Sequence, residues 1–224
     1  MSTAKKPNPK PEGYSPNEKP SIVEAVIKKA ENKYQKYKDF EFYLERESYL
    51  ETFKMAGVPW QAEFGNINDY HNNYQDKLMD QYDPYTEVGI GIEFINGWNY
   101  FFGCRVNSLD NLPEGITGVD TGLKNFAVIT FRADNTEKLL GGTDGPGDAM
   151  KTAGEYISNV WLPEHRDEVE FFNSDHGVYK IKNGDVDCGC AHIEVYKNTS
   201  SDNPEMCFYI PLKDNQIPGR ISGK

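Results

Sequence analysis

The chain has 224 residues, a net charge of −11 at pH 7, and 38% hydrophobic and 13% aromatic residues. This length suits one large domain or two small ones. The acidic balance argues against direct nucleic-acid binding, because that affinity depends on neutralising phosphates, and we find no apolar run long enough to cross a membrane.

The N-terminal part of the sequence differs from the rest in charge. Residues 1–20 contain five prolines and are predicted to be a disordered tail. Residues 21–38 are predicted to form a basic amphipathic helix, because Ser21 and Glu24 form a capping-box pair and apolar residues recur at helical spacing. Residues 1–38 carry a net +5, against −16 for the remaining chain. A helix docked on the domain and a helix that binds a protein partner both fit this pattern.

Cysteine usage and the N-terminus bear on the compartment. The sequence starts without the apolar stretch of a signal peptide, so we expect a cytoplasmic protein whose four cysteines are free thiols. Cys188, Cys190 and His192 alternate along one predicted strand, whereas structural zinc sites need a turn between paired ligands and a second pair elsewhere. The glycine-rich loop at 141–147 lacks the lysine of a phosphate-binding loop. We therefore predict neither a metal nor a cofactor.

Residues 39–214 alternate strand and helix signals and are predicted to form the globular domain, followed by a C-terminal tail at 215–224. Strands are expected at 40–44, 52–58, 86–94, 98–106, 124–132, 190–196 and 206–212, helices at 66–82 and 146–162, and hairpin turns at 96–97 and 183–184. The order is strand–helix–strand–strand, twice. It predicts an α+β fold in which an antiparallel sheet carries helices on one face and a ligand cleft on the other.

The strand that ends at Tyr196 is the most informative stretch. Ala191, Ile193 and Val195 would point to a core, while Glu194 points the other way, together with reactive and aromatic neighbours. A strand face of this kind either meets water or lines a pocket. Residues 87–93 alternate glycine with glutamate on one face, which leaves room for a molecule to lie against the backbone.

Three short motifs carry a resemblance to a known family. Residues 161–163 read Trp-Leu-Pro, residues 193–196 read Ile-Glu-Val-Tyr, and residues 208–211 read Phe-Tyr-Ile-Pro. In this order they resemble the gyrase-inhibitor-like effector-binding domain, which occurs at the C-terminus of AraC- and MerR-type regulators and as a stand-alone protein. The architecture matches over residues 40–213, and no helix-turn-helix segment precedes it, so the resemblance implies a stand-alone member.

The resemblance also implies a function. Family members hold aromatic, often cationic, drug-like molecules between the two halves, with a buried glutamate that matches Glu194 and a last-strand tyrosine that matches Tyr209. Many relatives have an acidic residue two positions before that tyrosine, where this chain has Cys207, and residues 172–187 look like an insertion. The pocket residues that we predict are Glu194, Tyr209, Tyr196, Trp161, Trp98, Tyr100 and Trp60.

Our main hypothesis is a binding protein for a hydrophobic or cationic small molecule. One alternative is a hydrolase of electrophilic toxins, an activity of some stand-alone relatives, in which Glu194 with Tyr209 or Tyr196 would perform general acid–base catalysis. The other is a protein-interaction module that acts through residues 21–38.

Overall fold

The computed structural model describes residues 27–49, 51–60, 86–91, 100–106, 108–112, 114–141, 147–170, 179–183, 186–190, 192–197 and 204–213. Its strands are β1 (Ile27–Tyr37), β2 (Phe40–Ser48), β3 (Lys54–Trp60), β4 (Thr86–Gly91), β5 (Tyr100–Val106), β6 (Thr117–Asp120), β7 (Asn125–Arg132), β8 (Tyr179–Asn183), β9 (Val186–Cys190), β10 (Ile193–Lys197) and β11 (Glu205–Pro211). Its helices are α2 (Thr136–Leu140), α3 (Asp148–Tyr156), the π-helical turn η2 (Ile157–Trp161) and α4 (Leu162–His165).

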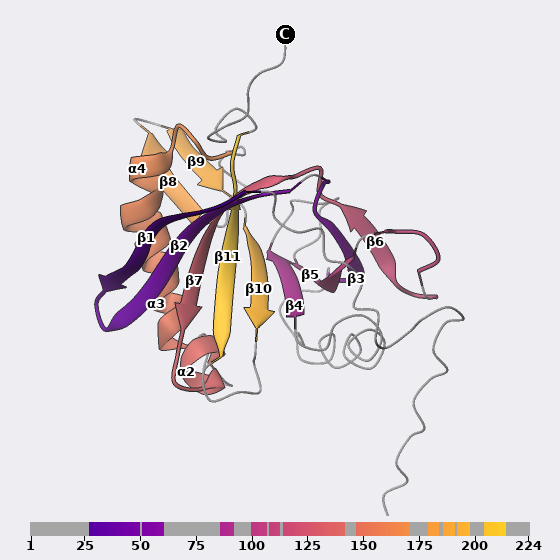
Figure 1. Ribbon diagram of the computed structural model, residues 1–224, viewed down its shortest axis with the longest axis horizontal. Coiled ribbons are helices and arrows are strands. Elements are labelled where there is room, and N and C mark those ends of the chain that lie inside the picture. Colours follow the sequence, from indigo (N-terminus) through magenta and orange to yellow (C-terminus); the bar gives the residue numbers. More distant parts are fainter. Residues whose placement is uncertain are drawn as a thin grey trace, which may run out of the picture.

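Nine of these strands form one sheet, in the order β1-β2-β7-β11-β10-β4-β5-β3-β6. Every described strand pair in it is antiparallel. The strands β8 and β9 form a separate antiparallel pair with Asn183 opposite Val186. A pair of antiparallel strands is therefore present where the hairpin was predicted at 183–184, but Asn183 belongs to β8 and the two residues that follow it lie outside the described residues. The helices lie beside the half of the sheet built from β1, β2, β7 and β11 (Figure 1). The mixed α+β class and the antiparallel sheet are therefore as predicted.

One face of the sheet packs against the helices. Phe42 of β2, Ile129 of β7 and Phe208 of β11 belong to the same buried cluster as Ile157 and Trp161 of η2. Each of these side chains is at most 2% exposed, and burying one such side chain stabilises the fold by about 1.5–3 kcal/mol. The apolar stripe of α3 and η2 is thus matched to alternate residues of three neighbouring strands.

The opposite face of the sheet is concave. Phe53, just before β3, contacts Phe126 of β7 with ring centroids 5.8 Å apart. Four strands separate β3 from β7 in the sheet order, so the sheet must curl to bring these two rings together. Both rings lie in a second buried cluster that includes Ile193, Val195 and Tyr209. Five of the eleven buried residues described in this cluster are aromatic.

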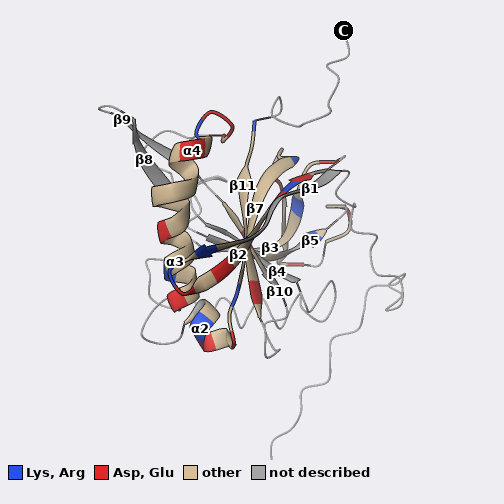
Figure 2. Ribbon diagram, turned by 60° about the vertical axis from the view of Figure 1, so that its left-hand side comes forward, with Lys and Arg blue, Asp and Glu red and all other residues tan. Residues whose placement is uncertain are grey.

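The central strands carry almost no charge. Along β7 and β11 the charged residues are Arg132 and Glu205, which lie opposite each other at the strand ends and form an ion pair. Figure 2 shows the long uncharged stretches of these two strands. Strands that are buried on both faces read as continuous apolar runs, and β11 is buried at every position from Met206 to Pro211.

The predicted basic helix at 21–38 is wrong where the structure describes it. Residues 27–37 form the edge strand β1, which pairs with β2 from Ile27 opposite Ser48 to Tyr37 opposite Phe40. Register shifts near Asn32 interrupt the two-residue alternation, and such bulges place an extra residue between inward positions. Helix-like spacing in the sequence therefore arises from an irregular strand, and its lysines suit an edge that must not pair with other chains.

The remaining differences are local. The connection between the strand predicted at 124–132 and the helix predicted at 146–162 contains the short helix α2, whose N-cap Asn135 accepts a hydrogen bond from the Lys138 backbone N–H at 2.8 Å. The helix expected at 146–162 is present as α3, η2 and α4, with the π-helical turn in its middle. The predicted helix at 66–82 and the turn at 96–97 lie outside the described residues.

Candidate functional site

Glu194 lies at the centre of the sheet. Its strand, β10, runs between β11 and β4, with Phe208 on one side of Glu194 and Gly89 on the other. Only 5% of Glu194 is exposed, so the possibility that this carboxylate faces water is excluded. Neighbouring residues Ile193 and Val195 point into the concave cluster, and Glu194 therefore lies on the helix side of the sheet.

His192 is the nearest polar partner of Glu194. Its Nε2 lies 2.8 Å from Oε1 of Glu194, and the ring is only 3% exposed. Because an ionised carboxylate accepts hydrogen bonds only, the imidazole N–H donates in this pair. The His192 ring also packs edge-on against Phe208, with ring centroids 5.0 Å apart. Burying a carboxylate costs free energy that hydrogen bonds of this kind offset.

The space beside Glu194 is set by its other neighbour. Gly89 contributes no side chain to the position directly across from Glu194. Gly91 lies two residues further along the same strand and so on the same face, opposite Tyr100 of β5, which in turn pairs with Trp60 of β3. The register therefore places two glycines next to the buried carboxylate and aromatic residues beyond them.

The cysteine motif does not extend this site. Cys188 and Cys190 belong to β9, which pairs with β8, whereas Glu194 belongs to β10 of the main sheet. The single strand face expected to carry Cys188, Cys190, His192 and Glu194 is thus divided between two sheets. His192 lies beside Glu194, and its position two residues before the glutamate was the signal that could have identified it as a partner.

Tyr209 does not lie with Glu194. It pairs with Ile193, and Glu194 pairs with Phe208, so strand alternation places the two on opposite faces of the sheet. Tyr209 is buried among Phe53 and Phe126 in the concave cluster. The prediction that Glu194 and Tyr209 line one pocket and form an acid–base pair is therefore wrong, because the sheet separates them.

The predicted aromatic residues divide into three groups. Trp161 is 1% exposed in the core beneath the helices and stacks on His165 at 4.5 Å between ring centroids. The register places Tyr196 opposite Met206, and Tyr100 and Trp60 opposite each other, on the face that carries Glu194. The side chains of these three, and the whole of Trp98, lie outside what the structure describes.

A second buried polar cluster occupies the concave face, and the sequence did not suggest it. The Tyr49 hydroxyl donates a hydrogen bond to Glu47, a carboxylate that is 5% exposed, and the Tyr209 hydroxyl donates to the Tyr49 hydroxyl. Burial raises the pKa of both phenols, and the neighbouring Glu47 charge raises them further. The Arg105 guanidinium lies 4.1 Å from the centre of the Tyr49 ring.

Three further observations bear on function. Among the residues that the structure describes, no three His, Cys, Asp or Glu side chains gather in a way that could hold a metal ion. None of the described helices is long and apolar enough to cross a membrane.

Comparison with protein-family models and with curated proteins finds no match for this chain. The two buried carboxylates, Glu47 and Glu194, are therefore the features from which a function can be argued.

Proposed function

We propose that this protein binds aromatic, cationic small molecules on the sheet face that carries Glu194. The observation behind the proposal is that a carboxylate only 5% exposed lies directly across from a residue without a side chain, Gly89. A carboxylate that is shielded from solvent attracts a positive charge more strongly than an exposed one. A planar cation over Gly89 would lie at hydrogen-bonding or ion-pairing distance from Glu194.

Aromatic positions around the glycines support a stacking ligand. Tyr196, Tyr100 and Trp60 occupy positions on the same face of the sheet as Glu194. Pockets for small molecules commonly combine apolar and aromatic walls with a few polar groups that fix orientation. Glu194 supplies negative charge to this site, and His192 holds its carboxylate in place through the bond at 2.8 Å.

The strand order supports a domain of the effector-binding type. Strands β3, β4 and β5 lie in the order β3-β5-β4, and strands β7, β10 and β11 lie in the order β7-β11-β10. In chain order, the first strand of each set lies beside the third: β3 beside β5, and β7 beside β11. The second strands of the two sets, β4 and β10, lie beside each other at the centre of the sheet. Two strand–helix–strand–strand units related by a twofold axis would have this order, with α3 as the helix of the second unit. Glu194 and Gly89 then lie where the two units meet.

The decisive experiment compares a planar cationic dye with a neutral analogue of the same size. We expect Glu194→Gln to weaken binding of the cationic dye by about 1.5–3 kcal/mol, which is about 10- to 100-fold in Kd. The affinity for the neutral dye should change little, because stacking does not use the carboxylate. Glu41→Gln is the matched control, since Glu41 is an exposed strand glutamate. Fluorescence titration of the three proteins measures all six affinities.

Two outcomes would contradict the proposal. An unchanged affinity of Glu194→Gln for the cation would remove Glu194 from the site, and equal binding of both dyes by the wild-type protein would remove the charge preference. Mass spectrometry of the recovered dye separates a binding protein, which returns it unchanged, from a hydrolase.

A further inference from the structure

An arginine of the protein itself occupies a cation-binding arrangement on the concave face. The Arg105 guanidinium lies 4.1 Å from the ring centre of Tyr49 and 4.7 Å from that of Phe53. Cations are attracted to aromatic faces within about 6 Å of the ring centre. Among the residues that the structure describes, none forms an ion pair with Arg105. Within this part of the chain, the two rings are therefore the contacts that the guanidinium charge makes.

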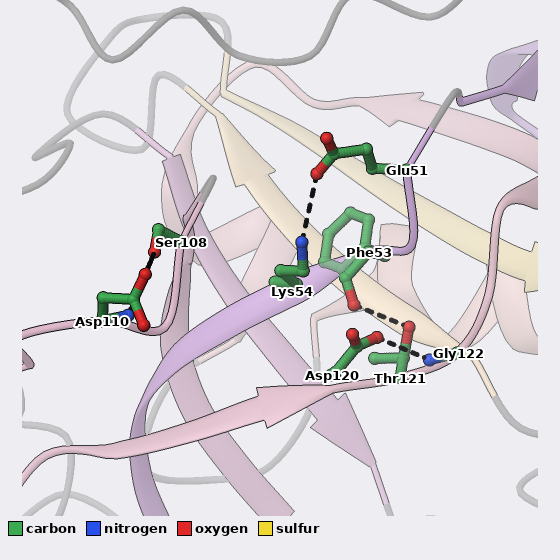
Figure 3. A network of polar contacts seen from close by, with 8 residues as sticks. All are labelled: Glu51, Phe53, Lys54, Ser108, Asp110, Asp120, Thr121 and Gly122. Carbon is green, nitrogen blue, oxygen red and sulfur yellow. Dashed lines mark hydrogen bonds and ion pairs between the residues drawn. The ribbon is translucent and has the colours of Figure 1, made fainter.

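Hydrogen bonds fix the backbone of Tyr49 and Phe53 independently of Arg105. The Phe53 carbonyl accepts from the Thr121 backbone N–H at 3.0 Å and from its hydroxyl at 2.7 Å, and the Phe53 N–H donates to the Leu123 carbonyl at 2.7 Å. The Tyr49 N–H donates to the Lys124 carbonyl at 3.0 Å. Figure 3 shows the bond between Phe53 and Thr121 beside the turn that Asp120 closes with the Gly122 N–H. Glu47, Tyr49 and Phe53 are called the cage below. Because these bonds do not involve Arg105, the backbone that carries the two rings would keep its position without that side chain, and preorganised sites bind more tightly.

Glu47 makes the cage more attractive to a cation. The Tyr49 hydroxyl donates to this buried carboxylate, and a phenol that donates to an anion has a more electron-rich ring. Tyr209 completes the chain through its hydrogen bond with Tyr49. The negative charge of Glu47 thus lies behind the ring whose face meets the guanidinium, and both effects favour a positive charge at that face.

Arg105 reaches the cage from β5, on the far side of the curled sheet. A side chain at Gly103 would collide with the Ala56 carbonyl oxygen, at 2.5 Å from the added carbon, so the glycine allows β5 and β3 to lie close together below Arg105. The Arg105 side chain is partly exposed, whereas Phe53 is 1% exposed. The cation is thus the part of the cage that meets solvent, on a long side chain that can leave by rotation of its own bonds.

We propose that Glu47, Tyr49 and Phe53 form a second site for small organic cations of the guanidinium or quaternary ammonium class, and that Arg105 is its internal occupant and competes with them. This site lies on the face of the sheet opposite Glu194 and does not depend on the function proposed above. An incoming cation would replace the guanidinium on the same two rings and release Arg105 to solvent.

The test uses the full chain and the probe tetramethylammonium, with sodium chloride at equal ionic strength as the blank. Arg105→Met removes the internal cation and keeps an apolar stem, and Arg132→Met is the matched control, because Arg132 is an exposed arginine paired with Glu205. We expect ligand-observed NMR to give an affinity for Arg105→Met at least about 10-fold above that of the wild type and of Arg132→Met. Equal affinity of all three proteins would overturn the proposal.

Double variants test whether the gain in tetramethylammonium affinity comes from the cage. Adding Glu47→Gln or Phe53→Leu to Arg105→Met should remove this gain in affinity, whereas adding Glu194→Gln should leave it unchanged. If Arg105→Met does not unfold cooperatively, Arg105→Lys decides the question: the compact ammonium stacks less well than the planar guanidinium, so the probe should again bind more tightly than to wild type. Variants that lose stability without gaining affinity would show that Arg105 is only a structural clamp.

Discussion

Glu194 and Tyr209 come within one residue of pairing across β10 and β11, yet they lie on opposite faces of the sheet. Glu194 is opposite Phe208, and Tyr209 is opposite Ile193. Glu194 faces the helix side with His192, and Tyr209 lies in the concave cluster with Tyr49. One sheet therefore separates two buried polar centres, which should respond independently to mutation.

The first prediction tests this independence. Glu194→Gln and Tyr209→Phe should have additive effects on the free energy of unfolding, because the strand register places the two residues on opposite faces of the sheet. The coupling energy is the difference between the effect of the double variant and the sum of the two single effects. We expect it to be below about 0.5 kcal/mol, measured by urea unfolding of the three variants and the wild type. A coupling above about 1 kcal/mol would show that the two centres communicate through the sheet.

The second prediction concerns alkaline pH. Burial, with the nearby Glu47 charge, raises the pKa of Tyr49 and of Tyr209, so the folded protein prefers both phenols neutral. This preference is fully present below the unfolded pKa of about 10. Above it the unfolded chain releases protons first, and stability falls by up to about 1.4 kcal/mol per pH unit for each such tyrosine. Tyr209→Phe should make this fall shallower, and equal slopes in both proteins would contradict the assignment.

The third prediction separates core from pocket at Trp161. Its ring is 1% exposed among the residues beneath the helices. Trp161→Ala should therefore cost about 3–5 kcal/mol of stability, and Val160→Ala, at the partly buried neighbour, should cost less. Urea unfolding measures both. The folded fraction of Trp161→Phe should bind the cationic dye as the wild type does, and a selective loss of dye binding would place the indole in the ligand site.

The fourth prediction concerns Cys207. The thiol is completely buried in the central strand β11, where it accepts a hydrogen bond from Thr130 at 3.2 Å. Alkylation requires an exposed thiolate, so Cys207 should react with iodoacetamide only after global unfolding. Peptide mass spectrometry at increasing urea should show its modification following the loss of fold. Rapid modification in native buffer would mean that β11 opens locally.

The sequence by itself determined the features that depend on local periodicity and local turns. Alternation placed Glu194 away from Ile193 and Val195, and the structure puts those two residues in the concave cluster. Tyr209 is likewise opposite in phase to Phe208, and the two lie in different clusters. The helix at 146–162 and the hairpin at 183–184 were predicted in the same way, because the residues that decide them are neighbours in the chain.

Only the tertiary structure decided which faces meet. Phase within one strand is a local property, but register between β10 and β11 shows that Glu194 and Tyr209 have opposite surroundings. Pairing with β2 turned residues 27–37 into a strand despite their helical spacing, since hydrogen bonds to a neighbouring strand outweigh weak local propensity. Arg105 meets Tyr49 and Phe53 because the sheet curls, and curling depends on the packing of residues far apart in the chain.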